Sequence, residues 1–270
     1  MTPLAPAAAS ILAEGRQAYV AIDTPSGPHV TPQLCAWSGG RLWFAAASTT
    51  RKAAVLVGGS RAAAVVAAPG RSVTLAGSVA VLDLRRPTAL IQSVGHLPEA
   101  VRAMLGFAAR NAADLAGFVG DLLRGRPGWR VPPVRVLYAV TPDHMAAIEN
   151  DAVTWSAGWP RPGDEPGAGA PRGGEPAVVT VSGPLGAPAR WFANDRLVVV
   201  APPVASLLGI ADHAGPMAVV VDRYNAVGPA AKQGMLTMGD ALPLGAGRFT
   251  LIPERIAEWD GIEVTSRKSR

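Results

Sequence analysis

The sequence changes its pattern within Arg41-Leu-Trp-Phe-Ala-Ala-Ala-Ser-Thr-Thr-Arg-Lys-Ala-Ala-Val-Leu56. The first six residues are apolar and strand-like, whereas the residues from Thr49 onward place apolar side chains at helical spacing, at Ala53, Leu56 and Val57. Thr49 or Ser48 can cap such a helix, and Gly58-Gly59 would end it. The segment therefore predicts a strand that turns directly into a short helix over Thr49 to Val57.

Short apolar runs separated by turn residues surround this segment. Ala18 to Asp23 and Pro28 to Trp37 precede it, and Ala62 to Ala67 and Ser72 to Leu82 follow it. Pro and Gly stand at the ends of these runs, as they do where short strands are joined by turns. This part of the chain is therefore predicted to be mainly β and to begin as an antiparallel meander.

Three further segments depart from the β pattern. Pro87 to Leu123 repeats apolar residues at helical spacing and predicts a helical insert packed beside the first strands. Gly158 to Glu175 is dense in Pro, Gly and Arg and predicts an exposed linker. Ala7 to Ala13 predicts a short amphipathic helix, since no basic region precedes it as in a signal peptide.

The order of elements begins again after the linker. Arg196-Leu-Val-Val-Val-Ala201 matches Arg41 to Ala46 at an offset of 155 residues (196 − 41), which holds without a gap to Val221. Phe249 to Ala257 repeats Tyr138 to Ala146 at an offset of 111 residues (249 − 138). The offset falls because the second copy lacks most of the helical insert. Two blocks in the same order predict two related halves, each a small β-barrel.

The composition argues against several classes of function. The net charge is +5 and the pI about 10.0, but few aromatic residues lie among the scattered Arg residues, so no platform for stacking bases is visible. The single cysteine, Cys35, falls in an apolar run and is predicted to be a buried structural thiol. The four His residues lack metal-ligand spacing, and no apolar run approaches the roughly 20 residues that span a bilayer. We therefore expect no nucleic acid, no metal, no membrane and a cytoplasmic location.

An ordered set of segments in the first half resembles a known family. The set consists of Ala18 to Asp23, Gly27-Pro-His-Val-Thr-Pro32, Arg41 to Leu56 and Val73-Thr-Leu-Ala-Gly-Ser-Val-Ala-Val81. In this order the segments resemble the pyridoxamine phosphate oxidase-like family of FMN-binding split β-barrels, with a weaker match in the second half. The resemblance implies a mainly β chain of two fused split barrels with a helical insert. The predicted units are residues 1–157, a linker at 158–175 and a second, degenerate barrel at 176–270.

The resemblance also implies a cofactor site in the first half. A phosphate is bound well by free N–H groups at a helix start and by fixed cations. Arg51 and Lys52 are implied to hold the phosphate, with help from the Thr50 hydroxyl, and Lys52 is expected to be exposed. The strand from Pro28 to Pro32 is implied to lie along the flavin ring, where His29 either contacts a ligand or is a turn-edge residue. The full predicted set is His29, Val30, Thr31, Pro32, Ala46, Ser48, Thr50, Arg51 and Lys52.

The second half departs from the family pattern. At the offset of 155, Arg51 and Lys52 become Ser206 and Leu207, and Ser48 becomes Pro203, so no phosphate clamp remains. Members of the family usually form homodimers with cofactors at the interface, so the fused chain is expected to be a monomeric pseudo-dimer or a homodimer. Its second half would wall the first half's site, with Arg223 and Lys232 as candidate contributors.

Three hypotheses on function follow from the resemblance. The first is an FMN-dependent oxidoreductase acting on a small molecule, in which the cofactor carries the hydride chemistry and no catalytic side chain is identified. The second keeps the fold and changes the cofactor to a deazaflavin. The third is a non-enzymatic flavin or haem binder, for which His96 or His144 could be an axial ligand.

Overall fold

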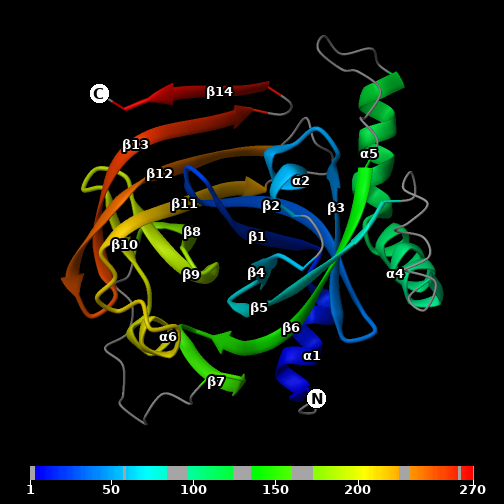
Figure 1. The fold of residues 1–270 in the computed structure, drawn as a ribbon, viewed down its shortest axis with the longest axis horizontal. Helices are drawn as coiled ribbons and strands as arrows, with labels where there is room; N and C mark the ends of the chain where they lie inside the picture. The colour runs from blue at the N-terminus through cyan, green and yellow to red at the C-terminus, as the bar shows by residue number, and fades with distance from the viewer. Residues whose placement is uncertain are drawn as a thin grey trace.

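The computed structural model describes residues 4–56, 59–83, 97–123, 135–159, 173–224, 232–260 and 263–269. Its strands form two antiparallel sheets that lie side by side, and each closes on itself as a six-stranded barrel (Figure 1). The chain is mostly β with few helices. The predicted fold class, two split β-barrels fused in one chain, is confirmed.

The first barrel has the strand order β3-β2-β1-β4-β5-β6 and is closed by pairing of β3 with β6, while β7 extends the sheet beside β6. Its strands are β1 (Gln17–Thr24), β2 (Gly27–Ser38), β3 (Arg41–Ala47), β4 (Arg61–Ala68), β5 (Arg71–Leu82), β6 (Arg135–Glu149) and β7 (Ala152–Ala157). The predicted meander is confirmed as β1, β2 and β3.

The second barrel repeats this order as β10-β9-β8-β11-β12-β13, is closed by pairing of β10 with β13, and adds β14 beside β13. Its strands are β8 (Glu175–Val181), β9 (Leu185–Phe192), β10 (Leu197–Val199), β11 (Gly215–Tyr224), β12 (Lys232–Gly245), β13 (Arg248–Asp260) and β14 (Glu263–Lys268). The two barrels therefore have the same topology. Most of the predicted linker lies outside the described residues.

A β-bulge at a glycine marks the same place in both barrels. Gly77 lies opposite Ala62 on β4 and opposite Pro142 on β6, at a shift of register. Gly239 lies opposite Met217 on β11 and opposite Pro253 on β13, again at a shift. These positions give offsets of 155 (217 − 62) and 111 (253 − 142), so the pairing of strands confirms the internal repeat.

The described residues contain five helices beside the strands of the two barrels. Helix α1 (Pro6–Glu14) buries Ile11 and Leu12 in the core of the first barrel, as predicted for an amphipathic segment. Helices α4 (Leu97–Arg110) and α5 (Ala112–Leu123) confirm the helical insert, and Ala103 of α4 packs on Trp43 and Ala139. Residues 87–96 of that prediction lie outside the described residues. In the described part of the chain, no helix has the length and hydropathy to cross a membrane.

The two barrels meet along apolar residues that face away from their own cores. Ala21, Val30 and Val65 of the first barrel pack with Val178, Ala218 and Val220 of the second in one buried cluster. The Thr74 hydroxyl donates a hydrogen bond to the Gly186 carbonyl across this junction, at 2.5 Å. The junction has the character of a protein core rather than of a loose domain contact.

Candidate functional site

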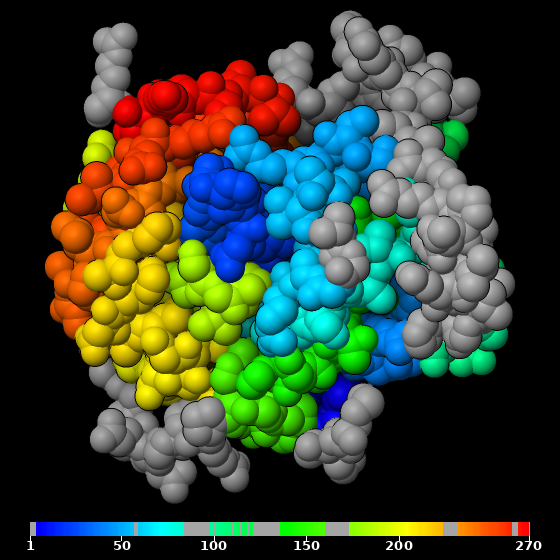
Figure 2. Space-filling model, in the orientation of Figure 1, coloured from blue at the N-terminus to red at the C-terminus, as the bar shows by residue number. Residues whose placement is uncertain are grey.

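The predicted strand-to-helix segment forms a very short helix. Helix α2 spans Arg51–Val55, and Thr50 is its N-cap, accepting a hydrogen bond from the Ala53 backbone N–H at 3.3 Å. The Thr50 hydroxyl also donates to the Ala47 carbonyl at 2.8 Å. The helix is thus shorter at both ends than the predicted Thr49 to Val57, and Val57 lies outside the described residues. Figure 2 shows α2 in light blue beside the blue β1–β2 hairpin on the visible face.

Lys52 is buried, contrary to the sequence expectation of an exposed lysine. Only 4% of the residue is exposed, its Nζ donates a hydrogen bond to the Thr31 hydroxyl on β2, and it lies 5.7 Å from the centre of the Phe44 ring. The expectation was wrong because the short helix lies against the barrel and turns this position inward. Burial lowers the pKa of Lys52 to about 7.

His29 lies on β2, two residues before Thr31, and is half-buried. Its Nδ1 atom is buried and has no hydrogen-bond partner among the described residues. Burial, followed by the positive charges of Lys52, Arg51 and Arg255, lowers the pKa of His29 to about 4. The imidazole is therefore neutral at physiological pH, in the field of three cations.

Two arginines from different barrels complete this group. Arg51 donates from Nη1 to the Ser26 hydroxyl at 3.0 Å, which ties α2 to the β1–β2 turn. Arg255 lies on β13 of the second barrel, and its Nε donates to the Ser266 hydroxyl on β14 at 2.9 Å. We call His29, Thr31, Arg51, Lys52 and Arg255 the basic site.

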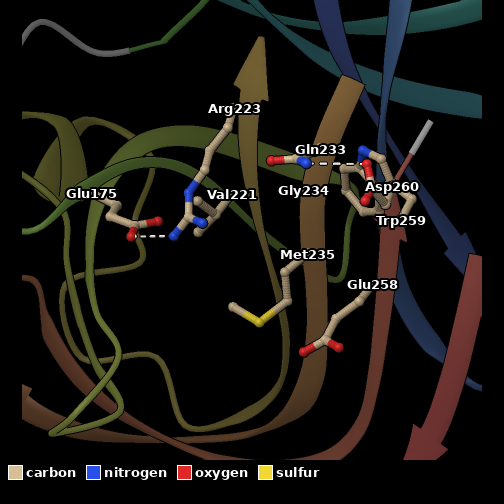
Figure 3. A pocket seen from close by; sticks show the side chains of 9 residues that line it. All are labelled: Glu175, Val221, Arg223, Gln233, Gly234, Met235, Glu258, Trp259 and Asp260. Carbon is tan, nitrogen blue, oxygen red and sulfur yellow. Dashed lines mark hydrogen bonds and ion pairs between the residues drawn. The ribbon is translucent and has the colours of Figure 1, made fainter. Parts of the chain in front are cut away.

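The sequence analysis missed Arg255, although one signal pointed to it. At the offset of 111, Arg255 occupies the place of His144, so the strand that carries it was already identified in the repeat. Arg223 and Lys232, the candidates named instead, lie elsewhere. Arg223 pairs with Glu175 at a separate cavity of about 300 Å³ on the second barrel (Figure 3). The charge of Lys232 acts on Asp222.

For the predicted residues Val30, Pro32, Ala46 and Ser48, the structure gives burial but no polar contact among the described residues that identifies a ligand. Val30 is fully buried at the barrel junction, Ala46 is part of the first core, and Pro32 and Ser48 are half-buried. Their assignment to a cofactor stays a prediction.

The second barrel replaces the basic site with apolar residues. Val65 and Val220, which are equivalent at the offset of 155, lie opposite Tyr19 and Val178. Tyr19 and Val178 in turn lie opposite Pro32 on β2 and Pro188 on β9, so Pro188 is the counterpart of Pro32. In the same register, Leu185 and Ala187 are the counterparts of His29 and Thr31. The segment at residues 201–208, which includes helix α6 (Pro202–Leu207), holds no cation. The described counterparts of His29, Thr31 and helix α2 in this half therefore carry no cation.

The match of residues 41–66 with residues 196–221, predicted to run without a gap, was wrong in one detail. Phe44 lies opposite Tyr138, whereas Val198 lies opposite Phe249, so the offset at β10 is 154 (198 − 44) rather than 155. The β9–β10 hairpin is two residues shorter than its counterpart, which shifts the strand and the helix after it. Leu207 is buried in α6, but it is not the positional equivalent of Lys52.

No family model matches the chain, and no curated protein matches it. Among solved structures, the chain is similar to a pyridoxamine 5'-phosphate oxidase-related, FMN binding protein from Nostoc punctiforme, with 18% identity over 55% of this chain and 86% of that chain and a TM-score of 0.38. It is also similar to a FAD-binding protein from Mesorhizobium loti, with 15% identity over 54% of this chain and 94% of that one and a TM-score of 0.34.

An F420 reductase is 18% identical over 53% of this chain and 98% of its own, with a TM-score of 0.32. Each similarity covers about half of the chain. The class of protein, a fused pair of split β-barrels, is defined by the two closed barrels themselves.

Proposed function

We propose that the chain binds a phosphate-bearing flavin, FMN in the first instance, at the basic site and uses it as an oxidoreductase acting on a small molecule. The observation that supports this most is the burial of Lys52. Its charge has a hydroxyl and an aromatic face as partners, and no carboxylate of the described residues contributes to its pKa. Burying an ammonium group is costly unless an anion compensates it.

The residues present fit a phosphate group. Lys52 and Arg51 are charged donors of the first barrel, and Arg255 of the second barrel is a third cation whose charge acts on His29. The Nδ1 atom of His29 is buried without a hydrogen-bond partner among the described residues, and buried polar atoms of this kind usually have a partner. When bound, a flavin supplies the hydride chemistry, and the protein binds and orients it.

The test is a titration of the purified protein with FMN and with riboflavin, which differ only in the phosphate, followed by flavin fluorescence. We expect FMN to bind at least tenfold more tightly than riboflavin, since charge-assisted hydrogen bonds contribute about 1.5–3 kcal/mol each. Equal affinity for both, or no binding of FMN, FAD or F420, would overturn the proposal.

Two variants locate the site. Arg255→Gln should reduce the preference for FMN over riboflavin, because it removes one of the three cations that act on His29. Arg248→Gln, an exposed position at the start of the same strand, is the matched control and should leave that preference unchanged.

A further inference from the structure

The insert helices α4 and α5 expose a group of large apolar side chains. A single residue, Asn111, separates the two helices, and Figure 1 shows both at one edge of the molecule, outside the barrels. Five of the nine large apolar side chains that are exposed in the described part of the chain lie here. We call this set the insert face: Val101, Met104, Leu105, Leu115 and Val119. Exposed apolar residues gathered on neighbouring elements mark an interaction site, whereas scattered ones do not.

Helix α5 is apolar in sequence but buries little. Its twelve residues are Ala, Gly, Leu, Phe and Val, except for Asp114 and Asp121. None of its described side chains is buried, and Leu115 and Val119 are exposed. A helix that is apolar around most of its circumference is normally buried, and a helix of this length is only marginally stable in water by itself. Helix α5 therefore lacks a packing partner among the described residues.

Helix α4 has one face on the first barrel and a second apolar face directed away from it. Glu99 forms an ion pair with Arg41 at 3.3 Å, and Ala103 is buried against the barrel. Val101 and Leu105 are neighbours one turn apart, and both are exposed. The second face is therefore free to receive another helix.

A cavity lies beside this second face of α4. Its volume is about 300 Å³, and it separates part of α4 from the outer surface of the first barrel. Met104 belongs both to the cavity wall and to the insert face. The other large side chains of the wall are Trp43, Leu82, Phe107 and Leu137. A ridge of apolar side chains with a hollow beside it is the kind of surface on which a second helix packs.

The charges of the two helices favour a second copy of the chain as the partner. Apart from Glu99, which is paired with Arg41, the charged residues of α4 are Arg102 and Arg110. Those of α5 are both acidic. A contact between α4 of one copy and α5 of another joins opposite charges, and a two-fold axis makes this contact twice. Basic residues beside the apolar face would favour a membrane surface, and α5 has none.

The barrel junction, where separate copies would meet in the resembled family, is filled within this chain. We propose that the chain forms a two-fold dimer through the insert face, in which α5 of each copy packs along α4 of the other. This contact covers the exposed apolar residues of both helices. It uses no residue of the basic site, so it stands or falls separately from the proposed function.

Sedimentation equilibrium of the full chain, from low micromolar to submillimolar concentration, tests the proposal. We expect a monomer–dimer equilibrium in the micromolar range, as for a small interface. Leu105→Ser on α4 and Val119→Ser on α5 each change both halves of a two-fold contact. A loss of roughly tenfold for each side chain then becomes a loss of about a hundredfold in dimer affinity. Because both side chains are exposed, thermal unfolding of the monomer should stay parental in these variants.

Leu242→Ser is the matched control, because Leu242 on β12 is as exposed as Val101 and lies outside the insert face. Its dimer affinity should be parental. A chain that stays monomeric at every concentration, or parental dimerisation by both Leu105→Ser and Val119→Ser, would overturn the proposal. So would assemblies larger than a dimer that disappear in Leu242→Ser. Flotation of the parent, but not of Val119→Ser, with phosphatidylglycerol vesicles would assign the face to a membrane instead.

Discussion

Lys52 couples ligand binding to protonation, because the anion needs an ammonium group that burial disfavours. Its pKa is about 7 in the folded chain. We expect the affinity for FMN to fall above pH 7, by up to tenfold per pH unit, while the phosphate itself stays doubly charged. Dissociation constants measured between pH 7 and 9 test this. Lys52→Arg keeps its charge throughout and should show a flat profile; a parallel fall in both proteins would place the titrating group elsewhere.

We expect the buried Lys52 to lower the free energy of unfolding. Because the pKa of Lys52 is lowered on folding, from 10.5 to about 7, the unfolded chain binds more protons between these values and stability rises with pH across that window. Lys52→Met removes a buried charge and fills similar space, so we expect the free energy of unfolding at pH 7 to rise by about 1–4 kcal/mol.

Urea unfolding at pH 7 and pH 10 measures both effects. The parent should gain stability between the two pH values, and the contribution of Lys52 to that gain should be missing from Lys52→Met. A less stable Lys52→Met protein would show that the ammonium group is well paired in the free state. FMN affinity should fall in the same variant, so function and stability move in opposite directions.

Among the elements, sequence periodicity predicted the strands and the insert helices, and the matching sequence blocks predicted the offsets of 155 and 111, of which the first does not hold at β10. It failed where a short element meets the barrel. Five residues of α2 are too few for periodicity to tell an inward face from an outward one, so the burial of Lys52 could not be predicted. Arg255 was missed because the cation comes from a strand that is distant in sequence and adjacent only through the packing of the barrels.

The glycine bulges are the elements that the two barrels share most closely, and they can be tested. A Cβ atom on Gly77 would lie 2.0 Å from the Thr141 carbonyl oxygen, and one on Gly239 would lie 1.9 Å from that of Ile252. We expect Gly77→Ala and Gly239→Ala each to lower the free energy of unfolding by roughly 2 kcal/mol or more, since backbone must shift.

Gly106 in α4 is the matched control for these variants. Nothing lies within 4 Å of a Cβ atom placed there, so Gly106→Ala should stabilise the helix by about 0.5–1 kcal/mol. Thermal unfolding of the three variants measures the contrast. Parental stability of both bulge variants would mean that the bulges are not fixed by close approach of the backbone.

At the scale of the whole molecule, the apolar junction makes one unit of two barrels. The sequence repeats predicted two barrels but not how the barrels pack against each other. Residues that face outward from one barrel cannot be told from other strand residues by their sequence pattern. Thr74 illustrates this: it lies in an apolar run of β5, is fully buried, and links the barrels through the Gly186 carbonyl. Whether the chain pairs further with a second copy stays a prediction.

Thr74→Val therefore tests the junction. The valine keeps the shape of threonine but leaves the buried Gly186 carbonyl without its donor, so we expect a loss of about 1–3 kcal/mol in the free energy of unfolding. Thr237 on β12 is the matched control: it is equally buried, but its hydroxyl has no partner among the described residues. Thr237→Val should be neutral or stabilising, because it removes an unsatisfied polar group. Equal losses in the two variants, measured by urea unfolding, would show that the hydrogen bond from Thr74 to the Gly186 carbonyl adds no measurable stability to the junction.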